Sequence, residues 1–359
     1  MNVLDLVRPE LRELRGYSSA RMEASGGRVL LNANESPWPG VADPEGALQR
    51  YPDGQQPQPL VQRLASLYGV PAANLLVARG SDECIDLLTR ATCRAGLDAV
   101  LVSPPTFAMY AVCAGIQGAA VLSVALDPAR GFVPDFERLR EVALAGPVKL
   151  VYVCTPNNPT GGIASIDAVL ALAHELAGRA LVVVDEAYAE FAAAPSLAPQ
   201  AARNGNLAVL RTLSKAHALA GARIGALVAD AGLIALLRRL LAPYPIAAPS
   251  ARAAIAALAP DALAATRLRV AALKAERARM AQAFARLPGV REVYPSEANF
   301  VTVRLDAAAA TYAALLAAGI VIRDVGGYPG LEGCLRFSIG TPGENDALLG
   351  VLARRERVA

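Results

Sequence analysis

The chain has 359 residues, of which 54% are hydrophobic and 19% are charged, and its formal net charge is +3. Such a chain can bury a large core, and its length suggests one large domain with a smaller one. It contains neither a long Lys/Arg run nor an uncharged apolar run of about 18 residues, so we expect no nucleic-acid partner and no membrane span.

The N-terminus and the cysteines indicate a cytoplasmic protein. Charges interrupt the first residues, MNVLDLVRPELRELRGY, where a secretory signal needs a continuous apolar segment. The five cysteines are odd in number and form no C-x-x-C pair, which is typical of free thiols in a reducing compartment. Two histidines are too few for a zinc site, so we expect no metal and look for an organic cofactor.

Short apolar runs alternate with alanine-rich helical patterns through much of the chain. The runs are β-branched or leucine-rich, and their spacing suits βαβ crossovers. The predicted strands are NLLVA (74–78), AVLVS (99–103), KLVYVC (149–154), ALVVVDE (180–186) and LAVLRT (207–212). This pattern predicts a mostly parallel, buried sheet.

The pattern changes after PYPIAAPSA (243–251), where three prolines interrupt it. A long charged helix is predicted over DALAATRLRVAALKAERARMAQAFARL (261–287). Alternating strands follow around NFVTVRL (299–305) and CLRFSIG (334–340), which indicates a C-terminal α+β domain.

The first polar motif after a predicted strand is RGSDECIDLL (79–88). Gly80, Ser81 and Asp82 stand at a strand-to-helix junction, where the free N–H groups of the first helical turn favour a phosphate. The alternative is an ordinary helix start capped by Ser81 or Asp82.

The second motif, CTPNNPTGG (154–162), begins at the end of the predicted strand KLVYVC (149–154). Its prolines hold the backbone in an irregular turn, which leaves asparagine amides such as that of Asn158 free to bind a ligand. The alternative is a turn without a ligand.

The third motif is ALVVVDEAY (180–188), in which four apolar residues lead into Asp185 and Glu186. At least one of these carboxylates is expected at the buried end of a central strand, where it needs a cationic partner. Tyr188 can place a phenol beside the same crevice. The alternative is a solvated loop acid with a packed tyrosine.

The fourth motif, RTLSKAHALAGARIG (211–225), adds Lys215 with a nearby hydroxyl, Ser214, and a guanidinium, Arg223. An isolated lysine usually faces solvent. Together with the other three motifs, however, this lysine completes a set that fits pyridoxal 5′-phosphate, which forms a Schiff base with lysine and needs an acid near its ring nitrogen.

These motifs carry a resemblance that runs over nearly the whole chain. The sequence resembles the fold-type I pyridoxal-phosphate aminotransferases and, within them, is similar to the histidinol-phosphate aminotransferase family. The matching segments are LNANESP (31–37), RYPD (50–53), RGSDE (79–83), PPTFAMY (104–110), YVCTPNNPTG (152–161), DEAYAEF (185–191), RTLSKAHALAGARIG (211–225), PYP (243–245), SEANF (296–300), GIVIRD (319–324) and CLRFSIGT (334–341).

The resemblance implies roles in cofactor binding and catalysis. Lys215 would hold the cofactor covalently and move a proton, Asp185 would pair with the pyridine nitrogen, and Phe107 would stack on the ring. Tyr188 and Asn158 would bind the ring oxygen. The residues expected around the cofactor phosphate are Gly80, Ser81, Asp82, Ser214 and Arg223.

The resemblance also implies a homodimer and a substrate site. Tyr51 would reach the cofactor phosphate of the other subunit. Arg336 would bind the α-carboxylate of glutamate, and Asn158 would also belong to the substrate site. Arg323 and Arg336 each lie among apolar neighbours in a predicted strand, where a structural salt bridge is the alternative to anion binding. Tyr17 would add a phenol at the phosphate end of the substrate.

Two residues depart from the family pattern. Phe107 replaces a frequent tyrosine, which keeps the stacking surface but removes a hydroxyl. His217 stands where phenylalanine or tyrosine is usual, and we expect a packed aromatic substitute rather than a catalytic group.

The expected fold is fold-type I α/β. Residues 41–244 would form the large domain around a mainly parallel seven-stranded sheet, residues 1–40 an N-terminal arm and part of the small domain, and residues 245–359 the rest of the small domain. The expected reaction converts L-histidinol phosphate and 2-oxoglutarate into imidazole-acetol phosphate and L-glutamate, in histidine biosynthesis. The alternatives are an aromatic amino-acid aminotransferase, a threonine-phosphate decarboxylase and a non-catalytic pyridoxal-phosphate sensor, which would need a DNA-binding domain.

Overall fold

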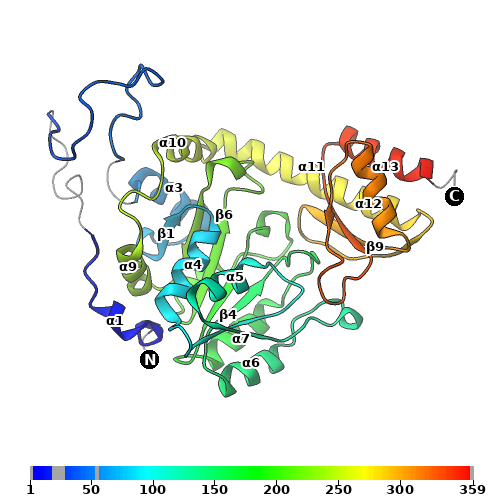
Figure 1. Ribbon diagram of the computed structural model, residues 1–359, viewed down its shortest axis with the longest axis horizontal. Coiled ribbons are helices and arrows are strands. Elements are labelled where there is room, and N and C mark those ends of the chain that lie inside the picture. Colours follow the sequence, from blue (N-terminus) through cyan, green and yellow to red (C-terminus); the bar gives the residue numbers. More distant parts are fainter. Residues whose placement is uncertain (1–2, 18–28, 53–55, 356–359) are drawn as a thin grey trace.

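The computed structural model describes residues 3–17, 29–52 and 56–355. Its elements form two sheets with helices packed around them (Figure 1). The larger sheet belongs to the first two thirds of the chain, and the smaller sheet, drawn in orange, belongs to the last quarter. The predicted combination of an α/β domain and a smaller α+β unit is confirmed.

The larger sheet has seven strands in the order β1-β7-β6-β5-β4-β2-β3. Strands β3, β2, β4, β5 and β6 are parallel, whereas β7 runs antiparallel to both of its neighbours, β1 and β6. The strands are β1 (Leu75–Ala78), β2 (Ala99–Val102), β3 (Ala120–Ser123), β4 (Val148–Cys154), β5 (Leu181–Asp185), β6 (Leu207–Thr212) and β7 (Gly225–Val228). The mainly parallel seven-stranded sheet is therefore confirmed.

Strands β3 and β7 were not among the predicted strands. Both have only four residues. Strand β3 is an edge strand whose side chains are largely exposed, so its sequence carries no run of buried positions. Strand β7 begins at Gly225, a residue that is disfavoured in strands and therefore weakens the local signal.

Apart from the edge strand β3, both faces of the larger sheet are buried, which explains why its strands are continuously apolar. Along β5, Val182 and Val184 pack into one core cluster, and Leu181 and Val183 pack into another on the opposite face. The helices that cover the two faces are α3 (Gln58–Tyr68), α4 (Ser81–Thr92), α5 (Met109–Gln117), α6 (Phe136–Ala145), α7 (Ile166–Glu175), α8 (Ala198–Ala201), α9 (Ala231–Leu240) and α10 (Ala248–Ala257).

The smaller sheet has four antiparallel strands in the order β10-β11-β9-β8. Its strands are β8 (Val290–Val293), β9 (Phe300–Leu305), β10 (Arg323–Asp324) and β11 (Cys334–Ser338), and the helices beside it are α12 (Ala308–Ala317) and α13 (Pro342–Arg355). The predicted charged helix is α11 (Pro260–Ala285), which runs from α10 to the smaller sheet (Figure 1). The domain limits at residues 40 and 244 stay a prediction.

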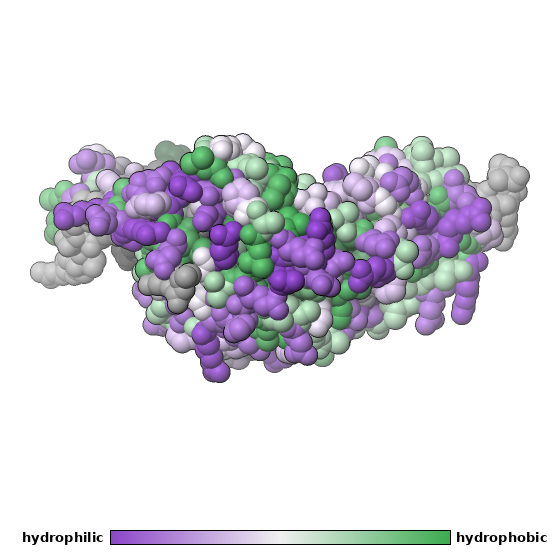
Figure 2. All heavy atoms as spheres, turned by 90° about the horizontal axis from the view of Figure 1, so that it is seen from below, coloured by the Kyte–Doolittle hydropathy of each residue, from purple (hydrophilic) through white to green (hydrophobic). Residues whose placement is uncertain are grey.

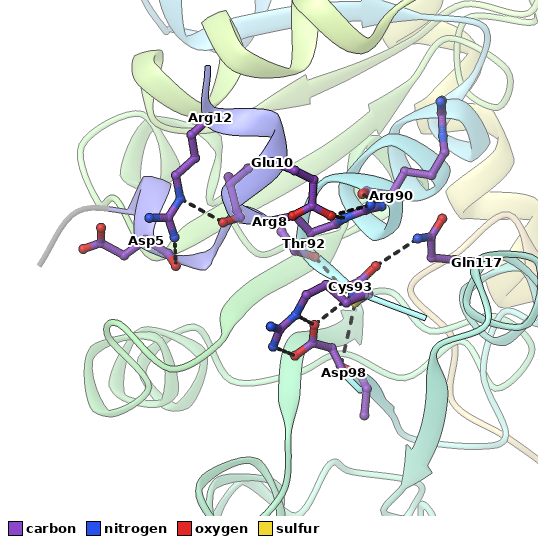
Figure 3. Close-up of polar contacts among 12 residues, drawn as sticks. Asp5, Arg8, Glu10, Arg12, Arg90, Thr92, Cys93, Asp98 and Gln117 are labelled. Carbon is purple, nitrogen blue, oxygen red and sulfur yellow. Dashed lines mark hydrogen bonds and ion pairs between the residues drawn. The ribbon is translucent and has the colours of Figure 1, made fainter. Parts of the chain in front are cut away.

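The N-terminal segment packs against the larger sheet's helices. It contains η1 (Val3–Leu6) and α1 (Pro9–Arg12), and Val3, Leu6 and Val7 enter the core cluster that also holds α4 and α9. Figure 3 shows Arg8 reaching the C-terminal end of α4, where its guanidinium donates a hydrogen bond of 3.2 Å to the carbonyl of Arg90.

The surface is mixed in hydropathy. On the face shown in Figure 2, hydrophilic residues are spread over both parts of the molecule and smaller apolar patches interrupt them. Among the residues that the structure describes, no helix combines the length and the hydropathy that crossing a bilayer requires.

Candidate active site

The four polar motifs of the sequence meet at one edge of the larger sheet, where β4, β5 and β6 end. A cavity of about 300 Å³ opens there, and we call it the Lys215 cavity. An open α/β sheet binds its ligands at this edge because the loops after its parallel strands converge there. The predicted residues that line the cavity are Ser81, Asp82, Phe107, Asn158, Asp185, Tyr188, Ser214, Lys215, Arg223 and Arg336.

The first turn of α4 forms one end of the cavity. Its N-cap is Gly80, with φ +80°, and no side-chain cap hydrogen bond is present among the described residues, so the alternative of a capping Ser81 or Asp82 is wrong. A Cβ atom on Gly80 would lie 2.5 Å from the Arg223 guanidinium, so only glycine allows this approach. Free N–H groups next to an arginine make this end suited to an anion such as a phosphate.

Arg223 and Ser214 complete the anion-binding end. Arg223 adopts a left-handed conformation with φ +55°, and its guanidinium lies 3.2 Å from the Asp82 carboxylate. The backbone N–H of Ser214 donates to the Thr212 hydroxyl at 3.1 Å, which fixes the turn after β6. Strand β7 packs directly against the start of α4. A Cβ atom on Gly225 would lie only 2.3 Å from the Ser81 nitrogen, so a larger residue would not fit there.

Lys215 lies on the cavity wall and is exposed to it. Its amine lies 5.7 Å from the centroid of the Tyr188 ring. Partial burial, followed by the nearby Arg336 guanidinium, lowers the pKa of this lysine. A lowered pKa increases the fraction of neutral amine, which is the nucleophilic form.

Asp185 ends β5 and is only 3% exposed. Its Oδ2 accepts a hydrogen bond of 2.7 Å from the Tyr110 hydroxyl, and its Oδ1 accepts one of 3.1 Å from the Ala187 N–H. Burial raises the pKa of Asp185 to about 6, although these two hydrogen bonds lower it. The prediction of a buried carboxylate at this strand end is confirmed.

Glu186, the next residue, is buried as well but faces away from the cavity. Its carboxylate pairs at 2.8 Å with the guanidinium of Arg211, which also contacts Glu190 at 2.5 Å. Arg211 is therefore the cationic partner of Glu186, one of the two carboxylates for which the sequence predicted such a partner. His217 is buried beside the same group, with its Nε2 3.8 Å from Glu190, and it does not line the cavity.

The opposite end of the cavity is formed by Asn158 and Arg336. The Arg336 guanidinium donates a hydrogen bond to Asn158 Oδ1 and lies 5.1 Å from the centroid of the Phe300 ring. Arg323 is the direct partner of Arg336 in the β10–β11 ladder, so both side chains lie on the same face of that sheet. Among the described residues, no carboxylate pairs with either guanidinium.

Four predicted site residues do not line the Lys215 cavity in this single chain. Gly80 precedes Ser81 and lies against the Arg223 guanidinium, outside the cavity lining. Arg323 is exposed at the edge of the smaller sheet, and Tyr17 is 67% exposed. Tyr51 is 50% exposed and stacks on Tyr244 at 4.5 Å, in a separate hollow of about 430 Å³. Asp53 of the RYPD motif lies outside the described residues.

Sequence reasoning missed several residues of the site. The additional lining residues are Cys154, Ala187, Thr212 and Ala220. Cys154 and Thr212 are the last residues of predicted strands. Because ligands bind at the carboxyl ends of parallel strands, both residues could have been predicted from the sequence. Tyr110 lies in the quoted PPTFAMY motif, but nothing local indicates its contact with Asp185.

A larger hollow of about 830 Å³ lies in the smaller domain. Its walls are mostly aliphatic and aromatic, and the charged groups that it brings together are Asp306 and Arg354. Among the described residues, no group of histidine, cysteine, aspartate and glutamate side chains is arranged to hold a metal ion. The Lys215 cavity is therefore the candidate active site.

Comparisons with known proteins agree with this geometry. The sequence profile of aminotransferase class I and II matches residues 28–352. A histidinol-phosphate aminotransferase of Xanthomonas campestris pv. campestris is 52% identical over 359 residues, which cover 100% of this chain and 99% of that protein.

Two solved structures have the same fold. The histidinol-phosphate aminotransferase of Sinorhizobium meliloti, in complex with pyridoxal-5′-phosphate, superposes with a TM-score of 0.78 at 28% identity and covers 91% of this chain and 90% of its own. The L-threonine-O-3-phosphate decarboxylase of Porphyromonas gingivalis superposes with a TM-score of 0.73 at 23% identity, covering 87% and 92%. The second likeness concerns the fold alone.

Proposed function

The chain belongs to the class I and II aminotransferases, and from this membership we propose that it exchanges an amino group between L-histidinol phosphate and 2-oxoglutarate. The products are imidazole-acetol phosphate and L-glutamate, and the reaction is a step of histidine biosynthesis. The full-length 52% identity to a histidinol-phosphate aminotransferase supports the substrate. The observation that carries the chemistry is the convergence of an amine, a buried carboxylate and an anion-binding helix end on one cavity.

The residues present fit pyridoxal 5′-phosphate. The uncapped first turn of α4 and the Arg223 guanidinium offer donors to its phosphate, and a side chain at Gly80 would block this cradle. Asp185 offers a carboxylate to the ring nitrogen, and Tyr188 and Asn158 offer donors to the ring oxygen. When bound, this cofactor withdraws electrons from the substrate carbon that loses its proton.

Each side chain has a separate task in this proposal. Lys215 attaches the cofactor and moves the proton at its Nζ, for which a lowered pKa is suitable. Asp185, in its ionised form, stabilises positive charge at the end of β5. Phe107 lies on the cavity wall, where it would cover the ring face of the cofactor.

Arg323 and Arg336 form the proposed substrate anion site. Their ladder pairing places two guanidinium groups on one face, and neither has a carboxylate partner among the described residues. A guanidinium fork can bind either a carboxylate or a phosphate, so the pair serves 2-oxoglutarate in one half-reaction and a phosphate ester in the other. Asn158, already bonded to Arg336, fixes the orientation of this group.

A homodimer accounts for the two tyrosines outside the cavity. Tyr51 and Tyr17 are both exposed in the single chain. We propose that Tyr51 reaches the cofactor phosphate of the partner subunit, and that Tyr17 contributes to the phosphate end of the substrate site. All five cysteines are free and buried, which agrees with the proposed cytoplasmic location.

A turnover assay distinguishes this function from its alternatives. Purified protein is incubated with L-histidinol phosphate, O-phospho-L-threonine or L-phenylalanine, with 2-oxoglutarate as acceptor. We expect turnover with histidinol phosphate well above the other two. Bound cofactor gives an absorbance band near the visible edge, which glutamate bleaches and imidazole-acetol phosphate restores. Preferred turnover of phenylalanine, or carbon dioxide release from phosphothreonine, would replace the proposed substrate.

Two variants test the assigned residues in the same assay. Lys215→Ala removes the amine, so we expect loss of the band and a fall in turnover of at least about 10² to 10⁴. Arg323→Ala weakens binding in both half-reactions by about 1.5–3 kcal/mol but spares the band. The control is Arg291→Ala, which removes an exposed arginine paired with Asp306 elsewhere on the same sheet. Unchanged constants for histidinol phosphate in Arg323→Ala would refute the shared anion site.

A further inference from the structure

Tyr110 makes the only side-chain hydrogen bond to Asp185 among the described residues. Tyr110 is the second residue of α5 and is fully buried, and its hydroxyl donates to Asp185 Oδ2 at 2.7 Å across 75 positions of the sequence. The second hydrogen bond, to Oδ1, comes from the backbone N–H of Ala187. Each carboxylate oxygen is therefore held by one donor, so the carboxylate plane cannot rotate, and the remaining lone pairs are left for a ligand in the cavity.

Tyr110 is itself fixed by aromatic contacts. Its ring stacks on Tyr152 with centroids 4.4 Å apart and an angle of 7° between the planes. It also makes a T-shaped contact with the Phe107 ring, with centroids 5.7 Å apart and an angle of 83° between the planes. Tyr110 thus connects the side chain proposed to cover the cofactor ring with the side chain proposed to face its nitrogen.

We propose that Tyr110 is a positioning residue, whose hydroxyl keeps the Asp185 carboxylate ionised and oriented toward the cavity. This inference rests on the proposed function of Asp185 as the partner of the cofactor's ring nitrogen. A neutral hydroxyl can donate to the carboxylate without competing for its charge, whereas a cation in this place would neutralise it.

The electrostatic surroundings of Asp185 show why the Tyr110 hydroxyl matters for the charge of this carboxylate. Burial raises the pKa of Asp185 to about 6, and the Tyr110 hydrogen bond is the largest influence that lowers it. The other titratable groups that interact electrostatically with Asp185 are Asp82, Cys84, Tyr152, Cys154, Glu186, Tyr188 and Lys215. The carboxylates of Asp82 and Glu186 raise the pKa further, so removing the hydroxyl moves Asp185 toward its neutral form at physiological pH.

The test compares two isosteric variants of the full-length chain, Tyr110→Phe and Tyr152→Phe. Tyr152 is the matched control because it belongs to the same buried stack and loses the same hydroxyl, which contacts Thr89 at 3.4 Å instead of Asp185. Each protein is titrated with pyridoxal 5′-phosphate at pH values from about 5.5 to 8.5, and the absorbance of the lysine-bound form gives the dissociation constant.

We expect Tyr110→Phe to bind the cofactor about ten- to hundredfold more weakly at pH 7, the range for a hydrogen bond to a charged group. Affinity falls as the pH drops through the pKa of Asp185, because a protonated carboxyl group cannot stabilise a protonated ring. In Tyr110→Phe this fall begins at a higher pH than in wild type. In Tyr152→Phe the midpoint of the fall is unchanged.

A double-mutant cycle separates positioning from a structural role. In an Asp185→Asn background there is no carboxylate to hold ionised, so adding Tyr110→Phe changes cofactor affinity by less than about threefold. A structural role of the hydroxyl would persist in that background and overturn the proposal.

The remaining outcomes are also decisive. Wild-type affinity in Tyr110→Phe at every pH, or an equal loss in Tyr152→Phe, would overturn the positioning role while leaving the proposed function intact. A wild-type protein that does not bind the cofactor would overturn both.

Discussion

Asp185 carries its charge at a cost to the stability of the cofactor-free protein. Its pKa is raised by burial to about 6, compared with about 3.9 in an unfolded chain. The folded state therefore binds the proton more tightly, and stability falls as the pH rises from about 4 to about 6. Above pH 6 the full penalty is present, and two pKa units correspond to about 3 kcal/mol.

We therefore expect Asp185→Asn to stabilise the cofactor-free protein above pH 6, by up to about 3 kcal/mol, and to lose this advantage by about pH 4. Urea unfolding at a series of pH values measures the difference. The same variant should bind the cofactor more weakly and turn over more slowly. Its matched control is Asp98→Asn, at an equally buried carboxylate that pairs with Arg94 at 2.8 Å.

For the control variant Asp98→Asn we expect a change in stability of the opposite sign. Burial alone would raise the pKa of Asp98, but the hydrogen bonds and charge of Arg94 lower it. Asp98→Asn should therefore destabilise the protein at neutral pH, and the loss should shrink as the pH falls through the lowered pKa. If both variants shifted stability in the same direction at neutral pH, burial would not explain the Asp185 penalty.

At the ends of β5 and β6, neighbouring residues point to opposite faces of the sheet. Asp185 and Thr212 line the Lys215 cavity, whereas Glu186 and Arg211 enter a buried ion cluster with Glu190. The Arg211 guanidinium also lies 4.8 Å from the centroid of the Tyr68 ring on α3. The cluster thus ties both strand ends and the η4 turn (Ala189–Phe191) together directly behind the site.

Removing Arg211 should loosen this junction. Arg211→Met leaves the buried Glu186 carboxylate and the partly buried Glu190 carboxylate without their arginine, and we expect a loss of about 3–5 kcal/mol in the free energy of unfolding. Arg90→Met is the comparison, because Arg90 makes a partly exposed pair with Asp86 on α4, which is worth less than about 1 kcal/mol. Chemical denaturation of both variants checks the difference. Equal losses would mean that the cluster adds nothing beyond a surface ion pair.

The proposed homodimer belongs to the scale of the whole molecule. Tyr51 stacks on Tyr244 in a hollow separate from the Lys215 cavity, so we expect its contact with a cofactor phosphate to be made across the proposed interface. Two chains related by a twofold axis would exchange these tyrosines and complete both sites at once.

A complementation experiment tests this exchange. Lys215→Ala and Tyr51→Ala chains are co-expressed with different tags, and the mixed dimer is purified. The Tyr51→Ala chain of that dimer retains its lysine and receives an intact tyrosine from its partner, so one complete site per dimer is expected. Turnover should exceed that of either parent dimer. A mixed dimer no more active than the Tyr51→Ala parent would show that Tyr51 acts within its own chain or not at all.

The sequence by itself determined the kind of chemistry and most of the strands that carry it. Apolar runs ending in Asp185 or shortly before Lys215 and Gly80 predict buried strands, and the carboxyl ends of parallel strands meet at one edge. Local spacing was therefore enough to bring the four motifs together, although they span residues 79–225.

Only the tertiary structure decided the contacts between distant side chains. Tyr110 meets Asp185, Arg211 meets Glu186, and Arg336 meets Asn158 across 178 positions. Strand β7 also pairs between β1 and β6, which brings Gly225 against Ser81. The physical reason is that periodicity records which face of an element is buried, whereas the partner of a buried hydroxyl or guanidinium depends on how whole elements pack.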